Sequence, residues 1–179
     1  RRSGLGGSRR ATRLLRLHSR HPAADGSERL LLALADGQLV ESVLLPRGGL
    51  CVSTQIGCAV GCRFCMTGKS GLLRQLSSLE LLAQLAQARR LRAVKKVVFM
   101  GMGEPAHNLD NVLQAIDLMA GDGGIGHKNL VFSTVGDPRV FERLGQREVK
   151  PALALSLHST CPVKRRELLP NAAPLSPQE

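Results

Sequence analysis

The sequence predicts an α/β fold in which parallel strands and helices alternate as in part of a (β/α) barrel. Short apolar runs alternate with segments of helical periodicity between residues 51 and 157. Most runs are continuously apolar, which is typical of strands in a parallel sheet covered by helices. Residues able to do chemistry follow the ends of these runs, where parallel barrels carry their sites. About four such strands are present, which makes half a barrel at most.

Composition indicates a folded chain in a reducing compartment. Hydrophobic residues make up 43% of the 179 residues, and Trp and Tyr are absent. The five cysteines are odd in number and three of them cluster, which favours metal ligands over a disulfide framework. No apolar run suits a transmembrane helix or a secretory signal. We therefore expect a cytoplasmic protein with no membrane contact.

The amino-terminal segment is strongly basic. Residues 1–20 contain seven arginines and no acid, so they carry seven of the eleven net positive charges. We expect residues 1–28 to form a flexible basic arm, either a solvated end or a contact for nucleic-acid phosphates. The sequence starts with Arg1 rather than Met and ends without a closing element, so we expect a fragment of a longer chain.

Residues 29–50 are expected to form a β-hairpin that leads into the barrel. Apolar runs flank Asp36-Gly37, and an Asp-Gly between such runs is a strong hairpin signal. Residues 50–56 are then predicted to form a strand that runs into a cysteine-rich loop. Residues 51–179 would be the amino-terminal part of the barrel, with its carboxyl-terminal part missing.

Helices and strands are predicted to alternate after this loop. Ser77 or Ser78 caps the first helix, with Glu80 in its first turn, and Asn108 or Asp110 opens the second. The expected elements are a helix from 77 or 78 to about 92, a strand over 94–100, a helix from 108 or 110 to 120, a strand over 128–135, a helix over 138–144 and a strand over 151–157.

Cys58, Cys62 and Cys65 form a CxxxCxxC motif in a glycine-punctuated loop. Thiolates are preferred ligands of iron–sulfur clusters and of zinc. Three thiols on a [4Fe–4S] cluster would leave its fourth iron open to a substrate. Alternatively, Cys51 could complete a four-thiolate structural zinc site. Its spacing from Cys58 is longer than zinc motifs use, so the cluster is favoured.

The segments around this motif narrow the interpretation. They are Cys51-Val-Ser-Thr-Gln-Ile-Gly-Cys58, Gly101-Met-Gly-Glu-Pro105, Phe132-Ser-Thr-Val-Gly136 and Leu155-Ser-Leu-His158. Together with the CxxxCxxC motif, they resemble the RlmN/Cfr group of radical S-adenosylmethionine (SAM) RNA methyltransferases over about residues 29–170. The resemblance implies a partial barrel of the radical SAM type. It also implies an amino-terminal helical domain, of which the basic arm would be a remnant.

The resemblance implies a [4Fe–4S] cluster and SAM as cofactors. The three clustered cysteines would bind the cluster, whose open iron would chelate SAM, and reduction would cleave SAM to a 5′-deoxyadenosyl radical. The implied SAM-binding residues are Gly103, Glu104, Ser133, Ser156, Leu157 and His158. A carboxylate such as Glu104 suits the SAM ammonium. Considered alone, Ser133 would be a helix cap and His158 a structural histidine.

The resemblance also implies two catalytic residues. Glu41 matches a carboxylate that removes the proton left when a methyl group is transferred to an sp² carbon. Cys51 matches a cysteine that resolves a protein–RNA crosslink by forming a disulfide with a second, methyl-carrying cysteine. No residue after Cys65 fits that second cysteine, because Cys161 follows the Leu155 to His158 motif too closely and sits where a helix begins. A later SAM-binding Asn is also missing, so we expect this chain to be inactive by itself.

These residues lead to an expected function. The chain would belong to a radical SAM methyltransferase that methylates an adenine carbon of 23S rRNA, C2 in preference to C8, with tRNA as a further substrate. Its partners would be RNA and an electron donor such as flavodoxin or ferredoxin. Phosphates would contact Arg74 and the basic run from Arg89 to Lys96. A flipped adenine would be read mainly through RNA shape, because Trp and Tyr are absent.

Two alternatives stay open at this point. One is a zinc-stabilised, non-catalytic nucleic-acid-binding module. The other is a radical SAM enzyme that acts on a peptide or a small molecule.

Overall fold

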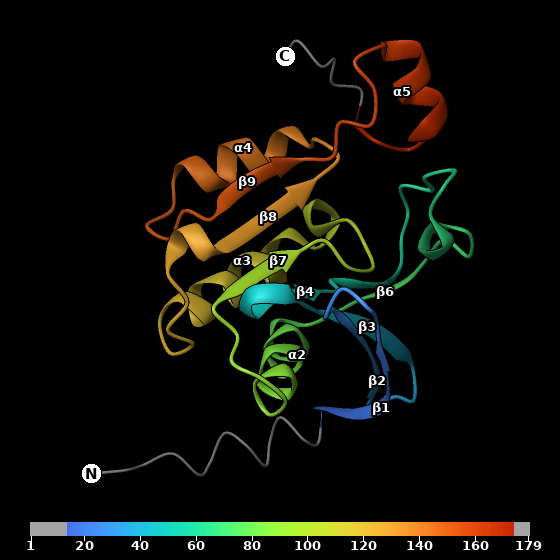
Figure 1. Cartoon of the computed structure of the whole chain (residues 1–179). Helices are drawn as coiled ribbons and strands as arrows, with labels where there is room; N and C mark the ends of the chain where they lie inside the picture. Colours follow the sequence, from blue (N-terminus) through green and yellow to red (C-terminus); the bar gives the residue numbers. More distant parts are fainter. Residues whose placement is uncertain (1–13, 174–179) are drawn as a thin grey trace.

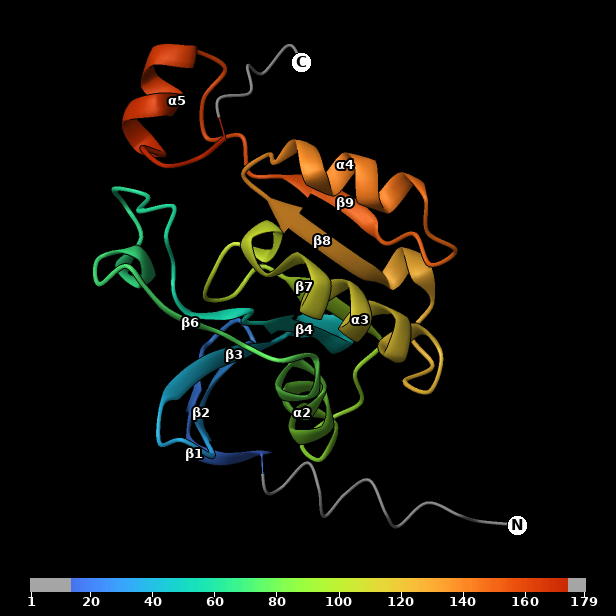
Figure 2. The same ribbon diagram turned by 180° about the vertical axis from the view of Figure 1, so that it is seen from behind.

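The fold is built around one mixed β-sheet. The structure, a computed structural model, describes residues 14–173. The large sheet has seven strands in the order β1-β2-β3-β4-β7-β8-β9, and a second sheet pairs β5 (Gln55–Gly57) with β6 (Leu72–Gln75). Helices α2, α3 and α4 cover one face of the large sheet, as two opposite views show (Figure 1, Figure 2).

The amino-terminal strands of the large sheet are antiparallel. They are β1 (Leu15–Pro22), β2 (Glu28–Leu34), β3 (Leu39–Leu45) and β4 (Gly49–Val52). The predicted hairpin is confirmed, because β2 pairs with β3 and Gly37 turns the chain with a φ of 83°. Glycine adopts such a positive φ without the strain that a Cβ would bring.

The expectation of a flexible arm over residues 1–28 is wrong for residues 15–22. These residues form β1 and pair with β2. Their apolar and polar side chains alternate, so that Leu15 is buried while Arg16 is exposed. Arg20 forms an ion pair with the buried Glu28, which gives one arginine a structural role. The many charged residues hide the alternation of buried and exposed side chains that is typical of a strand. Residues 1–13 of the predicted arm lie outside the described residues.

The parallel part of the sheet confirms the predicted α/β class. β4 pairs in parallel with β7 (Lys96–Phe99), β7 with β8 (Leu130–Thr134), and β8 with β9 (Ala152–Leu155). Four parallel strands with helices between them form the expected partial barrel. Within residues 14–173 the barrel does not close, because β1 and β9 are the two edges of the sheet.

The strand predicted over residues 50–56 is broken in two. β4 ends at Val52, and β5 pairs with β6 outside the large sheet. The Met102 carbonyl, in the turn after β7, fixes this break by accepting hydrogen bonds from the N–H groups of Thr54 (2.8 Å) and Gln55 (3.2 Å). The cysteine-bearing segment between β5 and β6 therefore leaves the large sheet and projects beside it (Figure 1).

Four α-helices complete the described chain. They are α2 (Ser78–Arg89), α3 (Leu109–Ala120), α4 (Pro138–Gly145) and α5 (Pro162–Leu168). The predicted capping box of α2 is confirmed, since Ser77 and Glu80 each accept a hydrogen bond from the other's backbone N–H. No helix among the described residues is long and apolar enough to cross a membrane.

The large sheet has a covered face and an open face, because successive strand residues point to opposite sides. Large side chains under the helices are fully buried, among them Leu30, Leu44, Leu50, Val97, Phe99, Leu130 and Phe132. The opposite face carries Cys51, which is in register with Val43 and Val98. All three are only partly buried, so this face is available for function.

Candidate active site

The cysteine loop, residues 58–71, connects β5 to β6. The carboxyl ends of β7, β8 and β9 point toward it (Figure 1). The Cys58 N–H donates to the Gly71 carbonyl at 2.9 Å, which closes the base of the loop, and the Cys65 N–H donates to the Cys62 carbonyl at 3.0 Å. The three predicted ligands therefore share one compact loop at the carboxyl edge of the sheet.

The thiols of this loop interact with one another electrostatically. Burial raises the pKa of the Cys58 and Cys62 thiols, and the negative charges of Cys65 and Glu104 raise both further. Thiols that repel each other's ionised forms are suited to bind a cation, because the metal replaces their protons and removes the repulsion.

The donor set has the chemistry that an iron–sulfur cluster requires, because thiolates are its usual ligands. Within residues 14–173, no three His, Cys, Asp or Glu side chains are gathered closely enough to hold one metal ion. In a [4Fe–4S] cluster each thiolate binds a different iron, so the ligands stand further apart than around one zinc. Three such thiols in one loop are compatible with a cluster.

Glu104 is a buried carboxylate in the turn after β7, only 4% exposed. Its oxygens accept hydrogen bonds from the N–H groups of Ala106 (3.1 Å) and Val135 (3.0 Å), and its own N–H donates to Gln55 Oε1 at 2.8 Å. Burial raises the pKa of Glu104, although hydrogen bonds from Thr134 and these N–H groups oppose the shift. A buried anion so placed gains free energy from a cationic ligand group.

Gly103 is required beside this carboxylate. Its φ is +98°, and a Cβ there would lie 2.6 Å from side-chain carbons of Gln55. A larger residue would thus be strained and would displace the side chain that holds the Glu104 N–H. Of this pair of predicted SAM-binding residues, the glycine shapes the turn and the glutamate supplies the charge.

The remaining predicted SAM-binding residues lie at the end of β8 and directly after β9. Ser133 Oγ and Ser156 Oγ are 3.2 Å apart, so the structure brings these hydroxyls together. The Leu157 N–H donates to the Leu155 carbonyl at 3.0 Å. His158 has a φ of 59°, and its ring lies 4.7 Å from that of Phe64 in the cysteine loop. The segment after β9 therefore contacts the cysteine loop.

Cys51 lies on the open face at the centre of the sheet. Burial raises the pKa of its thiol to about 11, although a backbone hydrogen bond from Met100 opposes the shift. A thiol with this pKa is protonated and weakly nucleophilic at neutral pH. Any reaction at Cys51 therefore needs a base to take its proton.

Glu41 shares the open face with Cys51. It lies two residues before Val43, the register partner of Cys51, and side chains two apart in a strand point to the same side. Its carboxylate pairs with Arg29 of β2 at 2.8 Å, and both side chains are about half exposed. The Glu41 N–H donates to Met102 Sδ at 3.4 Å, which connects β3 to the turn before Glu104.

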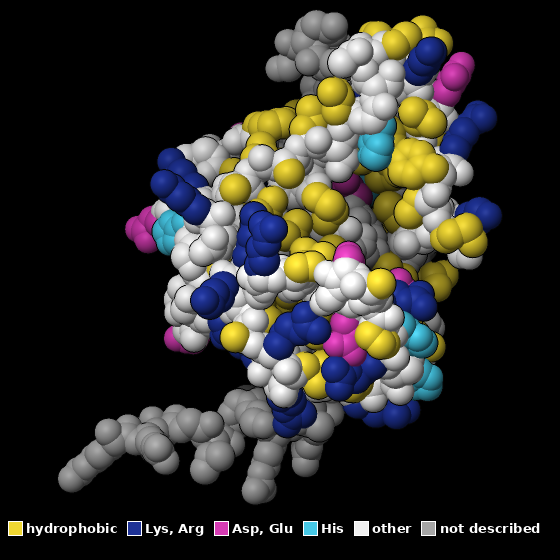
Figure 3. Space-filling model, viewed as in Figure 1, with side chains coloured by type: hydrophobic (Ala, Val, Ile, Leu, Met, Phe, Trp, Pro, Cys, Tyr) yellow, Lys and Arg dark blue, Asp and Glu magenta, His cyan; other side chains and the backbone are white. Residues whose placement is uncertain are grey.

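The predicted residues thus fall into two neighbouring groups. The cysteine loop, Glu104, the two serines and His158 lie at the carboxyl ends of the strands, whereas Glu41 and Cys51 lie on the open face. The surface between the loop and the sheet is hollowed, and hydrophobic side chains gather around the hollow (Figure 3). Exposed hydrophobic side chains of these segments include Phe64, Met66 and Met100.

Sequence reasoning missed several supporting residues. Gln55 holds the Glu104 N–H, Arg29 holds the Glu41 carboxylate, and the buried Arg165 donates to the Val135 carbonyl. Of these three residues, only Arg165 is marked in the sequence, because it is one of two adjacent arginines in a short helix. Cys161 is exposed and is the N-cap residue of α5, as its predicted helix-start position indicated.

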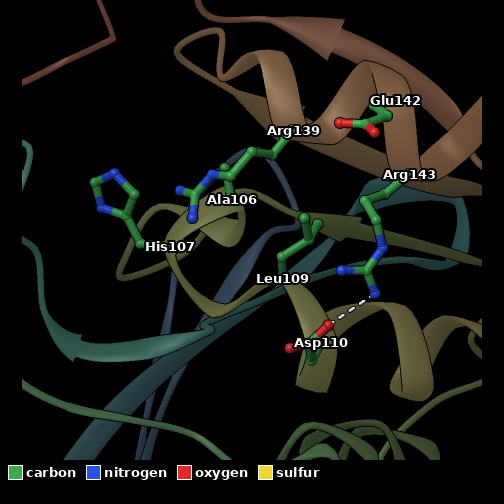
Figure 4. A pocket seen from close by; sticks show the side chains of 7 residues that line it. All are labelled: Ala106, His107, Leu109, Asp110, Arg139, Glu142 and Arg143. Carbon is green, nitrogen blue, oxygen red and sulfur yellow. Dashed lines mark hydrogen bonds and ion pairs between the residues drawn. The ribbon is translucent and has the colours of Figure 1, made fainter.

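A second hollow lies between α3 and α4 (Figure 4). It has a volume of about 310 Å³ and is lined by Ala106, His107, Leu109, Asp110, Arg139, Glu142 and Arg143. Both of its arginines already have partners, because Arg139 pairs with Asp137 at 2.7 Å and Arg143 with Asp110 at 2.8 Å. Its charges are thus balanced internally, and we assign it no ligand.

Comparisons with known proteins agree with this geometry. Residues 52–170 match the family model described as the Radical SAM superfamily. A probable RNA methyltransferase of Pseudomonas aeruginosa is 78% identical over 166 residues, which are 93% of this chain and 48% of the relative. One of Chromobacterium violaceum is 71% identical over 170 residues, 95% of this chain and 48% of the relative. The chain thus spans about half the length of the curated relatives it matches.

A solved structure shares the fold. The crystal structure of a radical SAM methyltransferase from Sphaerobacter thermophilus matches with a TM-score of 0.82 and 34% identity. The match covers 88% of this chain and 49% of that chain.

Proposed function

Because the chain belongs to the radical SAM superfamily, we propose that it is the SAM-activating half of an RNA methyltransferase of the RlmN/Cfr type. The observation that carries the proposal is that the turn after β7 links the two groups. Its Met102 accepts a hydrogen bond from the N–H of Glu41, on the open face that also carries Cys51, and its buried Glu104 interacts electrostatically with the cysteine loop. Relatives named probable RNA methyltransferases support an RNA substrate. The proposed target is an adenine carbon of 23S rRNA, C2 in preference to C8, with tRNA as a further substrate.

The cofactors would be held at the carboxyl ends of the strands. Cys58, Cys62 and Cys65 would hold a [4Fe–4S] cluster, which when bound supplies the electron that cleaves SAM. Glu104 would pair with the SAM ammonium, and the turn at Gly103 would let the backbone approach the ligand closely. Ser133, Ser156, Leu157 and His158 would complete the SAM site.

Glu41 would remove the proton from the adenine carbon that receives the methyl group. Its carboxylate pairs with Arg29 on the open face, where the adenine of the RNA could reach it. Exposed ion pairs of this kind contribute about 1 kcal/mol or less. RNA could therefore replace Arg29 as the partner of Glu41 at small cost, and Arg29 could then contact a phosphate.

Cys51 would resolve the crosslink between protein and RNA. Its sulfur would bond to the sulfur of a methyl-carrying cysteine from a part of the protein outside this chain. The bond between that second sulfur and the carbon on adenine would break. The carbon would keep the electron pair and take up a proton to become the methyl group, which releases the RNA and leaves a disulfide. The raised pKa of Cys51 would keep the thiol unreactive until a base takes its proton.

RNA and an electron donor such as flavodoxin or ferredoxin would be the partners, in the cytoplasm. Arg74 contributes less to RNA binding than its charge suggests, because it is paired with Glu80 and Asp36. The basic run from Arg89 to Lys96 precedes β7 and thus lies at the amino ends of the parallel strands, away from the site. Arg29 is the better placed cation.

The test uses the full-length protein, reconstituted anaerobically with iron and sulfide and supplied with SAM, a reductant and 23S rRNA. We expect a brown protein that bleaches on reduction, RNA-dependent formation of 5′-deoxyadenosine, and 2-methyladenosine in the digested RNA by mass spectrometry. Cys51→Ala should accumulate a covalent protein–RNA adduct, and Glu41→Gln should abolish methylation. A colourless protein that binds zinc would overturn the proposal. Formation of 5′-deoxyadenosine that does not depend on added RNA would also overturn it.

A further inference from the structure

The end of α5 and the turn after it contact both parts of the proposed cofactor site. We propose that this α5 segment, residues 165–171, positions the cysteine loop and Glu104 relative to each other, with Arg165 as the positioning residue for Glu104. The inference rests on the proposed roles of the loop as cluster ligand and of Glu104 as the partner of SAM.

Arg165 reaches Glu104 through one intervening residue. Its side chain is buried, with 6% of the residue exposed, and its guanidinium donates a hydrogen bond to the Val135 carbonyl. The Val135 N–H in turn donates to Glu104 Oε2 at 3.0 Å. Val135 is therefore held at both its carbonyl and its N–H, which fixes one of the hydrogen-bond donors to the carboxylate.

Burial of a guanidinium is costly unless its hydrogen bonds and surroundings offset the loss of hydration. The neighbouring Arg166 on the same helix is exposed, so burial is specific to Arg165 within this pair. The hydrogen bond from Arg165 to the Val135 carbonyl, next to the N–H that binds Glu104, gives this burial a role in the site.

The same segment fastens the cysteine loop. The Arg63 N–H donates to the Leu168 carbonyl at 3.0 Å. The Asn171 N–H donates to the Val60 carbonyl at 3.2 Å, and Asn171 Nδ2 donates to the Ala59 carbonyl at 3.0 Å. All three bonds are made to residues between the cysteines, so they hold the backbone that sets the spacing of the thiols.

An apolar contact also joins the cysteine loop to Val135, the residue that binds Glu104. Leu169 is 2% exposed and packs in one cluster with Cys58 and Val60 of the loop and with Val135. Gly61 lies directly beneath the segment, because a Cβ there would be 3.3 Å from Asn171 Nδ2. The α5 segment is therefore a physical link between the ligand loop and the Glu104 side of the site.

Two kinds of variant should separate the two contacts. Loss of the Arg165 guanidinium should free Val135 and weaken SAM binding while the cluster stays bound. Loss of the Asn171 amide should loosen the cysteine loop and speed release of iron while SAM affinity changes little. A role in folding alone would not divide the effects in this way.

The first experiment compares Arg165→Met and Arg165→Lys with Arg166→Met as the matched control, each in the reconstituted full-length protein. SAM is titrated against the electron paramagnetic resonance spectrum of the reduced cluster, and iron content is measured. We expect about a tenfold loss of SAM affinity in Arg165→Met, an intermediate loss in Arg165→Lys and none in Arg166→Met. Hydrogen exchange should rise in residues 134–137 of Arg165→Met.

The second experiment uses Asn171→Ala, because Asn171 is exposed and substitutions at exposed positions usually change stability little. We expect faster hydrogen exchange in residues 58–63 and faster iron loss to a chelator, with SAM affinity within twofold of wild type. Equal SAM affinity in Arg165→Met and Arg166→Met would overturn the inference. If Arg165→Met does not fold, Arg165→Lys and Asn171→Ala decide. A wild-type protein that takes up no cluster would refute the proposed function instead.

Discussion

Gln84 on α2 holds the end of β4 through both backbone polar groups of Ser53. Its side-chain amide donates to the Ser53 carbonyl at 2.9 Å, and its carbonyl oxygen accepts from the Ser53 N–H at 2.9 Å. The same oxygen accepts from the Ser42 hydroxyl of β3 at 2.7 Å. Gln84 is fully buried, so this side chain fixes the point at which the chain leaves the sheet for the cysteine loop.

Replacing Gln84 with Leu should destabilise the protein strongly. The leucine fills similar space but leaves a buried N–H, a carbonyl and a hydroxyl without partners, each costing about 1–3 kcal/mol. We expect the free energy of unfolding to fall by about 3 kcal/mol or more in urea denaturation. Gln87→Leu, on a partly exposed position of the same helix, should change it by about 0.5 kcal/mol or less. Similar losses in both variants would contradict this role of Gln84.

Cys51 should react with alkylating agents only at high pH. With a thiol pKa of about 11, on the order of one molecule in a thousand carries the thiolate at pH 8. The rate of iodoacetamide labelling should rise about tenfold per pH unit from 7 to 10, because the thiolate fraction does. A variant that keeps Cys51 as its single cysteine allows the rate to be followed by mass spectrometry. A rate that levels off below pH 9 would refute the raised pKa.

Substitution of Gly103 by Ala should disturb Glu104 without touching its side chain. The new Cβ would meet Gln55, and the positive φ adds backbone strain, which together should cost about 1–3 kcal/mol. We expect a lower urea midpoint and weaker SAM binding. Gly145→Ala is the matched control, because a methyl group added there would have no other atom within 4 Å and the φ of Gly145 is not positive. Unchanged SAM binding in Gly103→Ala would argue against the role given to this turn.

Much of the fold could be predicted because its signals are local. The Asp36-Gly37 turn, the Ser77–Glu80 capping box and the apolar runs of β7 and β8 each depend on a few adjacent residues. β1 is not predicted, because its arginines mask the alternation of buried and exposed side chains. The predicted strand over 50–56 is too long, because the Met102 carbonyl that breaks it belongs to a segment distant in sequence.

The site divides in the same way. The spacing of Cys58, Cys62 and Cys65 is visible in the sequence, so their shared loop could be predicted. The partners that shape the site could not, because the contacts of Arg165 with Val135 and of Arg29 with Glu41 join separate elements. A polar residue on an apolar helix face, such as Gln84, is the kind of sequence signal that marks such contacts.

SAM affinity should fall as the pH is lowered, and the fall should begin above the pKa of an ordinary glutamate. Burial raises the pKa of Glu104, so protonation removes the charge that pairs with the SAM ammonium at a higher pH than usual. The folding stability of the ligand-free protein depends on pH in the opposite direction to SAM affinity. The contribution of Glu104 to folding stability is full below the pKa of the unfolded state and is lost as the pH rises through the raised pKa of the folded state. Calorimetric titration of SAM between pH 4.5 and 7 should show the loss of affinity. Glu104→Gln should bind SAM about tenfold more weakly at pH 7 and show little dependence on pH, and a wild-type affinity that stays constant down to pH 4.5 would rule out Glu104 as the partner of the ammonium.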